Sequence, residues 1–396
     1  MIKKSREPLF RITRKSNVSG IRKILYILAC VAVAVLISIL FIFIVSQKNP
    51  FEALKLIFEG TFHLRANGTF NTNRFGKFLT KMILLLAVAL ALTPAYKMKF
   101  WNIGGRGQIL MGGLATAACM IYLRGKVPSW AILVISGFSG TFLGAIWGYI
   151  PAIFKSKWQT NETLFTLMMN YIAAFIVIIF YNFWKGDRSN LGQINSAGEE
   201  GYFPIWKLTD SGPLNSAIIP ALIVAFLVFS TFIYLRYTKH GFEILVVGDS
   251  AQTAKYIGIN VGHVLRRTML VSGAICGFVG FLMVSNFDYT ISSATDQGFG
   301  FTAIIVCWLA NFNPFAMVGY SSLISFLNVG AENLKSSGYS PNLNEYSSEF
   351  ISFVIILAFM LGHFFGNYTI QFRKNPNRFH NLLLKGIELE EVTNNE

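Results

Sequence analysis

Hydrophobic residues are gathered into long runs along this chain, and short polar segments rich in lysine and arginine separate the runs. Lipid cannot hydrogen-bond a peptide group, so a segment that crosses a bilayer is a helix or part of a closed barrel, and these runs lack the alternation of strands. Apolar runs of about 17 to 25 residues are long enough to cross as helices. The pattern predicts an all-α, polytopic membrane helix bundle. The ten predicted spans are 24–45, 78–96, 100–123, 129–150, 162–183, 215–236, 267–286, a less clear 299–311, 314–331 and 349–367.

Composition supports a membrane protein. Of the 396 residues, 53% are hydrophobic and 13% are charged, whereas a soluble globular protein carries about 25% charged residues. The net charge of +15 would suit nucleic acid, but the basic residues lie between the apolar runs and form no long basic face. We therefore expect membrane lipid, and no nucleic acid, among the partners. The four cysteines lie inside apolar runs, which predicts no disulfide and no metal site.

Positive charge also predicts the orientation, because lysine and arginine are enriched on the cytoplasmic side of a membrane. The N-terminal arm, the loop at 237–266 and the C-terminal tail are all basic. Ten spans place all three on one side. We expect a multi-pass plasma-membrane protein with both termini in the cytoplasm. Its predicted parts are a basic arm at 1–23, a transmembrane domain at 24–370 and a tail at 371–396.

One span begins with polar and glycine residues, WNIGGRGQ at 101–108. The roughly 15 apolar residues after it reach about 22 Å as a helix, which is short of about 30 Å of hydrocarbon. Non-helical backbone at membrane depth is tolerated where it faces protein or a water-filled cavity. A broken helix that lines the solute pathway is one interpretation, and a glycine-rich turn at the cytoplasmic end is the other. The pathway candidates are Asn102, Gly104, Gly105, Arg106 and Gln108.

Asn170 and Tyr171 form a polar pair inside the apolar run 162–183. Both side chains need hydrogen-bond partners in hydrocarbon, so we expect both to point into the bundle. Contact with the solute explains the pair, and so does structural hydrogen bonding between helices. The sequence leaves these two interpretations open.

Two sets of glycines predict close contact between helices. Glycine recurs every four residues in the fourth span, which places these positions on one helix face where a neighbour can approach closely. The seventh span carries a similar set. The glycines are Gly140, Gly144 and Gly148 in the fourth span, and Gly273, Gly277 and Gly280 in the seventh.

The residues within the spans bear on the source of energy. The middles of the spans hold no aspartate or glutamate, so the spans offer no obvious acidic group to bind a coupled proton or sodium ion. No GxxxxGK[ST] phosphate loop occurs in the chain, so this polypeptide does not hydrolyse nucleotide by that route. We expect no cofactor and no catalytic residues in this chain, and a partner ATPase that binds ATP and supplies the work. A secondary carrier that works alone is the alternative.

A partner ATPase needs a contact surface on the cytoplasmic side, and residues 241–260 provide a candidate. The sequence predicts a short helix there that ends at Gly258. Ala251, Ala254 and Ile257 are spaced to form an apolar stripe on that helix. An exposed apolar stripe favours a docking surface, and a helix that lies against the membrane interface is the alternative.

Three stretches resemble the permease subunits of binding-protein-dependent ABC importers for nucleosides and simple sugars, a group related to branched-chain amino-acid permeases. They are NIGGRGQILMGGLA at 102–115, NETLFTLMMNYIA at 161–173 and GDSAQTAKYIGINV at 248–261. The resemblance covers about residues 50–335, and its second stretch is closer to the nucleoside branch than to the ribose branch. It implies a type II importer fold with two permease subunits, identical or homologous. It also implies two cytoplasmic ATPases and an extracellular substrate-binding lipoprotein.

The resemblance implies roles for particular residues as well. Family members use the loop matching 248–259 as a coupling helix that contacts the ATPase. One departure concerns Arg106, because the family commonly carries glutamate there, and this puts the solute preference or the packing of the break in doubt. The resemblance implies a nucleoside permease, and a free base or a simple sugar such as ribose or galactose remains an alternative solute. The implied coupling residues are Gly248, Ala254, Tyr256, Gly258 and Ile259.

Overall fold

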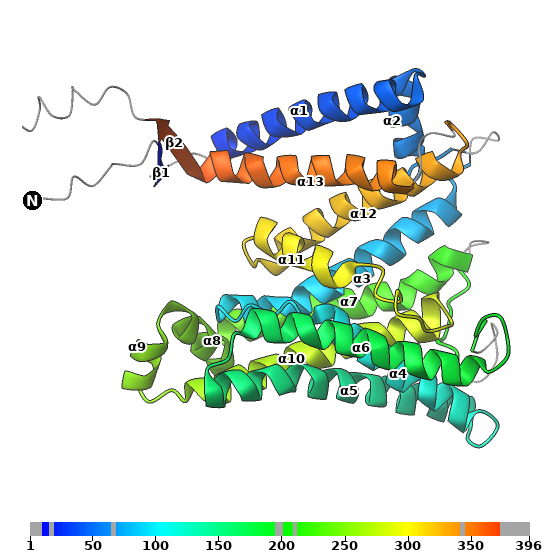
Figure 1. The fold of residues 1–396 in the computed structure, drawn as a ribbon, viewed down its shortest axis with the longest axis vertical. Helices are drawn as coiled ribbons and strands as arrows, with labels where there is room; N and C mark the ends of the chain where they lie inside the picture. Colours follow the sequence, from blue (N-terminus) through cyan, green and yellow to red (C-terminus); the bar gives the residue numbers. More distant parts are fainter. Residues whose placement is uncertain are drawn as a thin grey trace, which may run out of the picture. The chain divides into compact units, whose positions relative to one another are not determined.

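The computed structural model describes residues 10–15, 20–64, 69–194, 201–208, 212–340 and 345–372, drawn as a ribbon in Figure 1. Most of the predicted basic arm, and the tail after residue 372, lie outside these ranges. The helices are α1 (Gly20–Ser46), α2 (Pro50–Glu59), α3 (Thr72–Lys97), α4 (Gly105–Leu123), α5 (Ser129–Trp158), α6 (Glu162–Lys185), α7 (Gly212–Tyr237), α8 (Lys239–Asp249), α9 (Ala251–Tyr256), α10 (Val261–Leu282), the π-helix η1 (Met283–Phe287), α11 (Phe299–Leu309), α12 (Pro314–Ser336) and α13 (Glu345–Asn367). The strands are β1 (Phe10–Arg14) and β2 (Tyr368–Phe372).

A helix lies over each of the ten predicted spans, so the chain is a polytopic helical membrane protein. Seven helices among the described residues are long and apolar enough to cross a membrane: α1, α3, α5, α6, α7, α10 with η1, and α12. Of the others, α4 has 19 residues, and the described apolar part of α13 is Phe353–Asn367. The 11 residues of α11 reach about 16 Å, roughly half of a 30 Å hydrocarbon core. The predicted span 299–311 is therefore a half-length helix.

Asparagine starts five of the helices. The first turn of a helix lacks partners for its backbone N–H groups, and an asparagine oxygen just before the helix supplies one. The side chain of a single asparagine therefore marks where each of these polar loops ends and the next helix begins. These N-caps are Asn49 of α2, Asn71 of α3, Asn161 of α6, Asn260 of α10 and Asn313 of α12.

Residues 42–352 form one compact unit, in which glycines let α5 and α10 touch backbone to backbone. A Cβ atom on Gly144 would lie 2.5 Å from the Cα atom of Gly277, and one on Gly148 would lie 3.0 Å from the Cα atom of Gly273. A Cβ atom on Gly280 would collide with the backbone of α4 in the same way. The close packing predicted for these glycines is confirmed, and it makes α4, α5 and α10 one tightly joined group.

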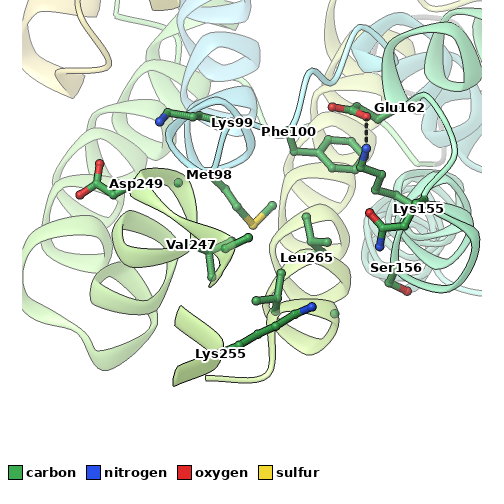
Figure 2. Close-up of a pocket in the computed structure, with 15 residues that line it drawn as sticks. Met98, Lys99, Phe100, Lys155, Ser156, Glu162, Val247, Asp249, Lys255 and Leu265 are labelled. Atoms are coloured by element: carbon green, nitrogen blue, oxygen red, sulfur yellow. Dashed lines mark ion pairs between the residues drawn. The ribbon is translucent and has the colours of Figure 1, made fainter. Parts of the chain in front are cut away.

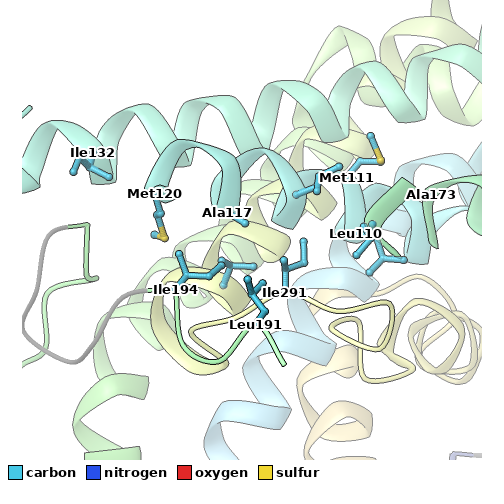
Figure 3. Packing of buried hydrophobic residues seen from close by; sticks show 12 residues of the cluster. Leu110, Met111, Ala117, Met120, Ile132, Ala173, Leu191, Ile194 and Ile291 are labelled. Atoms are coloured by element: carbon cyan, nitrogen blue, oxygen red, sulfur yellow. The ribbon is translucent and has the colours of Figure 1, made fainter. Parts of the chain in front are cut away.

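Apolar side chains fix two long loops against α4 (Figure 3). Leu191 and Ile194, from the loop after α6, lie beside Met120 and the other buried side chains of α4. Ile291, from the loop between η1 and α11, joins the same cluster. The two loops are also bonded to each other, because Ile194 N donates to Tyr289 O at 2.8 Å. The loop that leads into α11 is thus held on the bundle.

The second compact unit comprises residues 1–41 and 353–396, and its described part is a helix pair with a two-stranded sheet. β1 and β2 run antiparallel, with Phe10 opposite Phe372 and Arg14 opposite Tyr368. Next to β1, Lys15 Nζ donates to Phe365 O at 2.8 Å. The predicted all-α fold class is confirmed, and this small sheet is an element that the sequence pattern did not indicate.

Candidate functional site

The break predicted from WNIGGRGQ is the connection between α3 and α4, and its polar backbone is paired with neighbouring helices. Tyr96 Oη donates to Asn102 O at 2.7 Å. Ile103 N donates to Thr166 Oγ1 of α6 at 3.2 Å, and Gly104 N donates to Asn102 Oδ1 at 2.9 Å. These backbone N–H and C=O groups at the break therefore have hydrogen-bond partners within the protein, as burial in a membrane requires.

Asn170 of α6 holds the start of α4 against this connection. Its Oδ1 atom accepts from Gly107 N at 2.8 Å, and its Nδ2 atom donates to Ile103 O at 2.9 Å. A side chain at Gly107 would displace its neighbours, since its Cβ atom would lie 2.9 Å from Trp147 Nε1 and 3.0 Å from Asn170 Oδ1. One asparagine thus joins α6 to both sides of the break.

A second non-helical segment, residues 288–298, follows η1 and leads into α11. The far end of α11 lies beside the end of α3, because Trp308 stacks on Trp101 with ring centroids 5.5 Å apart. Since α11 reaches only about halfway through the hydrocarbon core, the turn just before it lies near mid-depth. Transporters commonly place their solute sites where such discontinuous helices meet.

An ion pair joins the two breaks. Arg106, in the first turn of α4, donates from Nε to Asp296 Oδ1 at 3.1 Å and from Nη2 to Ser293 O at 2.9 Å. Asp296 Oδ2 accepts from Gly298 N at 3.2 Å, at the start of α11. The backbones meet at the same point, where a Cβ atom on Gly300 would lie 2.6 Å from Arg106 N.

Another acidic residue, Asp288, lies where the second break leaves η1. Gln297 Nε2 donates to its Oδ1 atom at 3.1 Å. Both ends of the second break therefore carry an aspartate that the break itself helps to hold.

The predicted pathway residues occupy different environments. Asn102, Gly104, Gly105, Gln108 and Asn170 are buried, and Arg106 is partly exposed. Tyr171 is 59% exposed on the surface of α6, so the expectation that it points into the bundle is wrong. Successive helix residues are about 100° apart, so Asn170 and Tyr171 cannot share one face.

Three buried polar atoms at the first break have no hydrogen-bond partner among the described residues. They are Asn102 Nδ2, Gln108 Oε1 and Trp147 Nε1. An unpaired buried donor or acceptor costs about 1–3 kcal/mol. The break therefore holds donors and acceptors that are unused in this conformation.

The predicted coupling segment forms α8 and α9 at one end of the bundle, hereafter the α8–α9 end. Gly248 packs directly on the carbonyl of Lys97, the last residue of α3. Ala254 is fully buried in the core beneath α9, whereas Tyr256 is 91% exposed. The predicted apolar stripe is therefore wrong, because Ala254 points inward and leaves Tyr256 and Ile257 on the surface.

The other predicted coupling residues surround these two. Ala251 is exposed in the first turn of α9, and Ile259 packs partly against the core beneath it. Gly258 has a φ of +84°, a backbone conformation that side chains disfavour, and this lets the chain turn sharply after α9.

A cleft of about 610 Å³ opens beside this segment (Figure 2). One wall comes from α8, α9 and the start of α10, and the other from the end of α5 and the start of α6. Lys155 and Glu162 form an ion pair across the α5–α6 turn, with Nζ and Oε2 2.7 Å apart. Phe100, at the start of the first break, also lines the cleft. The cleft and the break are therefore adjacent.

Sequence reasoning missed Asp296 and Thr166. Asp296 lies outside every predicted span, and the only sign of its depth is that 299–311 is too short to cross. Thr166 lies within NETLFTLMMNYIA at 161–173, but nothing in that stretch distinguishes it from the neighbouring helix residues.

Replacing Asn170 by leucine is expected to destabilise the chain by about 2–4 kcal/mol. The substitution leaves the buried Gly107 N–H and Ile103 C=O groups without their partner, at about 1–2 kcal/mol each. Thermal unfolding in detergent measures the effect. The matched control is Tyr171→Leu on the exposed side of the same helix, which is expected to unfold near the wild-type temperature. Equal effects of the two substitutions would contradict the role given to Asn170.

The chain is similar in sequence to known transport proteins. Guanosine ABC transporter permease protein NupP of Bacillus subtilis is 28% identical over 309 residues, covering 77% of this chain and 85% of that protein. Nucleoside ABC transporter permease protein NupB of Lactococcus lactis is 28% identical over 298 residues, covering 72% and 80%. Glucose ABC transporter permease protein TsgB13 of Haloferax volcanii is 25% identical over 307 residues, covering 76% and 80%.

A family model matches a still longer part of the chain than any single motif. The model is described as branched-chain amino acid transport system / permease component, and it matches residues 75–360. That range contains both breaks, the ion pair between them and the α8–α9 end. The chain therefore belongs to the family of branched-chain amino-acid transport system permease components.

Proposed function

We propose that this chain is the membrane permease subunit of an ABC importer that carries nucleosides. The observation that carries the mechanism is the contact of Gly248 with the carbonyl of Lys97. Through this contact the coupling segment abuts the last residue of α3, immediately before the first break. A displacement of α8 and α9 therefore acts on the connection that bears Asn102 and Arg106.

In this mechanism a partner ATPase binds the exposed Tyr256 and Ile257. Closure of the ATPase dimer displaces α9 together with the buried Ala254, and the motion passes through α8 to the end of α3. The connection at the first break then shifts against α6, and the buried donors and acceptors there become available to solute. Alternating access follows from the reversal of this shift.

The remaining partners and the orientation belong to the same proposal. The α8–α9 end faces the cytoplasm, because Arg236, Lys239, Lys255, Arg266 and Arg267 gather there. Both termini then lie in the cytoplasm. A second permease subunit, a cytoplasmic ATPase and an extracellular substrate-binding lipoprotein complete the importer.

The solute assignment is supported by the names of the two relatives of highest identity given above, a guanosine and a nucleoside permease. A simple sugar is the second candidate, and the glucose permease relative favours it. Both solutes are uncharged and rich in hydroxyl groups. Nucleosides add a base whose carbonyl and ring nitrogens suit the amides at the first break.

Asp296 changes one argument about the energy source. The absence of acidic residues from the predicted spans argued against ion coupling, yet Asp296 lies near mid-depth. Its partner Arg106 keeps it in an ion pair, so it is not an isolated carboxyl awaiting a proton or sodium ion. ATP-driven transport through a partner remains the proposal.

Uptake into proteoliposomes tests the proposal. The chain reconstituted with its partner subunits is expected to accumulate labelled guanosine and uridine when ATP is supplied, and a large excess of glucose should not compete. The chain alone, under a proton or sodium gradient, is expected to accumulate neither nucleoside. Gradient-driven uptake by the chain alone would overturn the ATP-driven mechanism, and competition by glucose would favour the sugar.

A further inference from the structure

We propose that Asp296 is a positioning residue that neutralises Arg106, so that the junction of the two breaks favours uncharged solutes over anionic analogues. The proposal rests on the proposed function in assuming that solute passes this junction. It adds a residue outside every matched motif and explains how a partly exposed arginine is compatible with a neutral solute.

Burial differs between the two partners. The Asp296 side chain is 3% exposed, and the Arg106 side chain is 30% exposed. The guanidinium group is therefore partly open to its surroundings, whereas the carboxylate is enclosed by protein. Because the carboxylate is close and shielded from water, it offsets the arginine charge much more strongly than a surface partner would.

The hydrogen bonds of Arg106 leave one of its nitrogen atoms available to solute. Its Nε and Nη2 atoms bond to Asp296 Oδ1 and Ser293 O, and Nη1 has no partner among the described residues. Arg106 thus offers solute a hydrogen-bond donor without a net charge. A carbonyl or hydroxyl oxygen suits such a donor, whereas a phosphate is bound more strongly by a cation that has no carboxylate partner.

Asp296 also fixes where this donor lies. Its second oxygen accepts from Gly298 N at the start of α11. Gly300 packs on the backbone of Arg106, so the carboxylate spans the point where α4 and α11 begin. Loss of the carboxylate would leave a guanidinium group unpaired near mid-membrane, which is destabilising and attracts anions.

Thermal unfolding of the purified full-length chain in detergent tests the proposal, with uridine, uridine monophosphate and inorganic phosphate as probes. The variants are Asp296→Asn, Arg106→Gln and the neutral pair R106Q/D296N. Asp187→Asn is the control, because Asp187 is an exposed acid at the far end of α6. Each single variant at the junction is expected to unfold several degrees below wild type, and the neutral pair to recover most of that loss.

The anion probes separate charge from packing. Uridine monophosphate and phosphate are expected to raise the unfolding temperature of Asp296→Asn by several degrees, and to leave wild type and the neutral pair unchanged. If Asp296→Asn accumulates too little protein, the neutral pair becomes the test, and it must accumulate like wild type.

Three results would overturn the proposal. They are an Asp296→Asn variant as stable as Asp187→Asn, a neutral pair no more stable than the single variants, and equal protection of wild type and Asp296→Asn by the anions. A failure of the proposed function would look different. Nucleoside uptake would then be absent, while the coupling between Arg106 and Asp296 and the response to phosphate would persist.

Discussion

Replacing Gly277 by leucine is expected to remove most of the folded protein from the membrane fraction. A Cβ atom at this position would lie 2.9 Å from the Cα atom of Gly144 and would collide with the carbonyl of Gly140. Backbone atoms of α5 cannot move aside as a flexible side chain does, so the helices must separate. We expect a cost above about 3 kcal/mol, the upper end of ordinary overpacking. Size-exclusion chromatography in detergent measures the yield of monodisperse protein.

Gly319→Leu is the matched control, because Gly319 also lies inside a long helix but has open space around the position of a Cβ atom. Leucine favours a helix more than glycine does, by up to about 1 kcal/mol. The control is expected to give at least the wild-type yield. If Gly277→Leu were recovered equally well, the tight contact between α5 and α10 would not hold the bundle together.

Replacing Tyr256 by alanine is expected to uncouple ATP hydrolysis from transport with little effect on folding. At 91% exposure the ring contributes almost nothing to the core, so the unfolding temperature should stay near that of wild type. A tyrosine that acts as a hot spot of an interface contributes about 2 kcal/mol or more to binding, about a 30-fold change in affinity. ATPase affinity and nucleoside uptake in proteoliposomes measure the effect.

Trp130→Ala is the control for this substitution. Trp130 is 71% exposed, in the first turn of α5 at the end opposite the α8–α9 end, and its removal is expected to leave ATPase binding unchanged. A Tyr256→Ala chain that binds the ATPase as wild type does would contradict the coupling role. It would move the contact to another part of the α8–α9 end.

The bundle could be predicted because membrane insertion depends on local properties of the sequence. Each long helix is apolar over a length that hydrocarbon requires, and this is visible without knowledge of any tertiary contact. The strands around Phe10 and Phe372 escaped prediction because their pairing is a long-range event between short segments that carry no periodic signal. The half-length of α11 was visible in 299–311, but the sequence does not say that the preceding loop descends to meet α4.

Site residues that are adjacent in the sequence could be predicted, whereas a site residue that only the fold brings to them was missed. WNIGGRGQ is unusual for a span, so Asn102, Arg106 and Gln108 could be identified directly. Asp296 lies in a stretch that looks like an ordinary external loop. Its importance arises only because Arg106, 190 residues earlier, lies against it.

The coupling segment shows a different limit of prediction from the sequence. Its short helix was correctly expected, but Ala251, Ala254 and Ile257 were grouped by spacing alone. Spacing says which residues share a face and does not say which face is covered. In α9 only Ala254 of these three residues is buried, so the aromatic ring of Tyr256 becomes part of the outward surface.

The pairing of β1 with β2 has a consequence for biosynthesis. Phe10 and Phe372 are partners, so β1 leaves the ribosome long before β2 has been synthesised. At about 5–20 residues per second, this wait lasts roughly 20 to 70 seconds. Closure of the sheet is therefore among the last steps of maturation, and a chain truncated before residue 368 would keep its first strand without a partner.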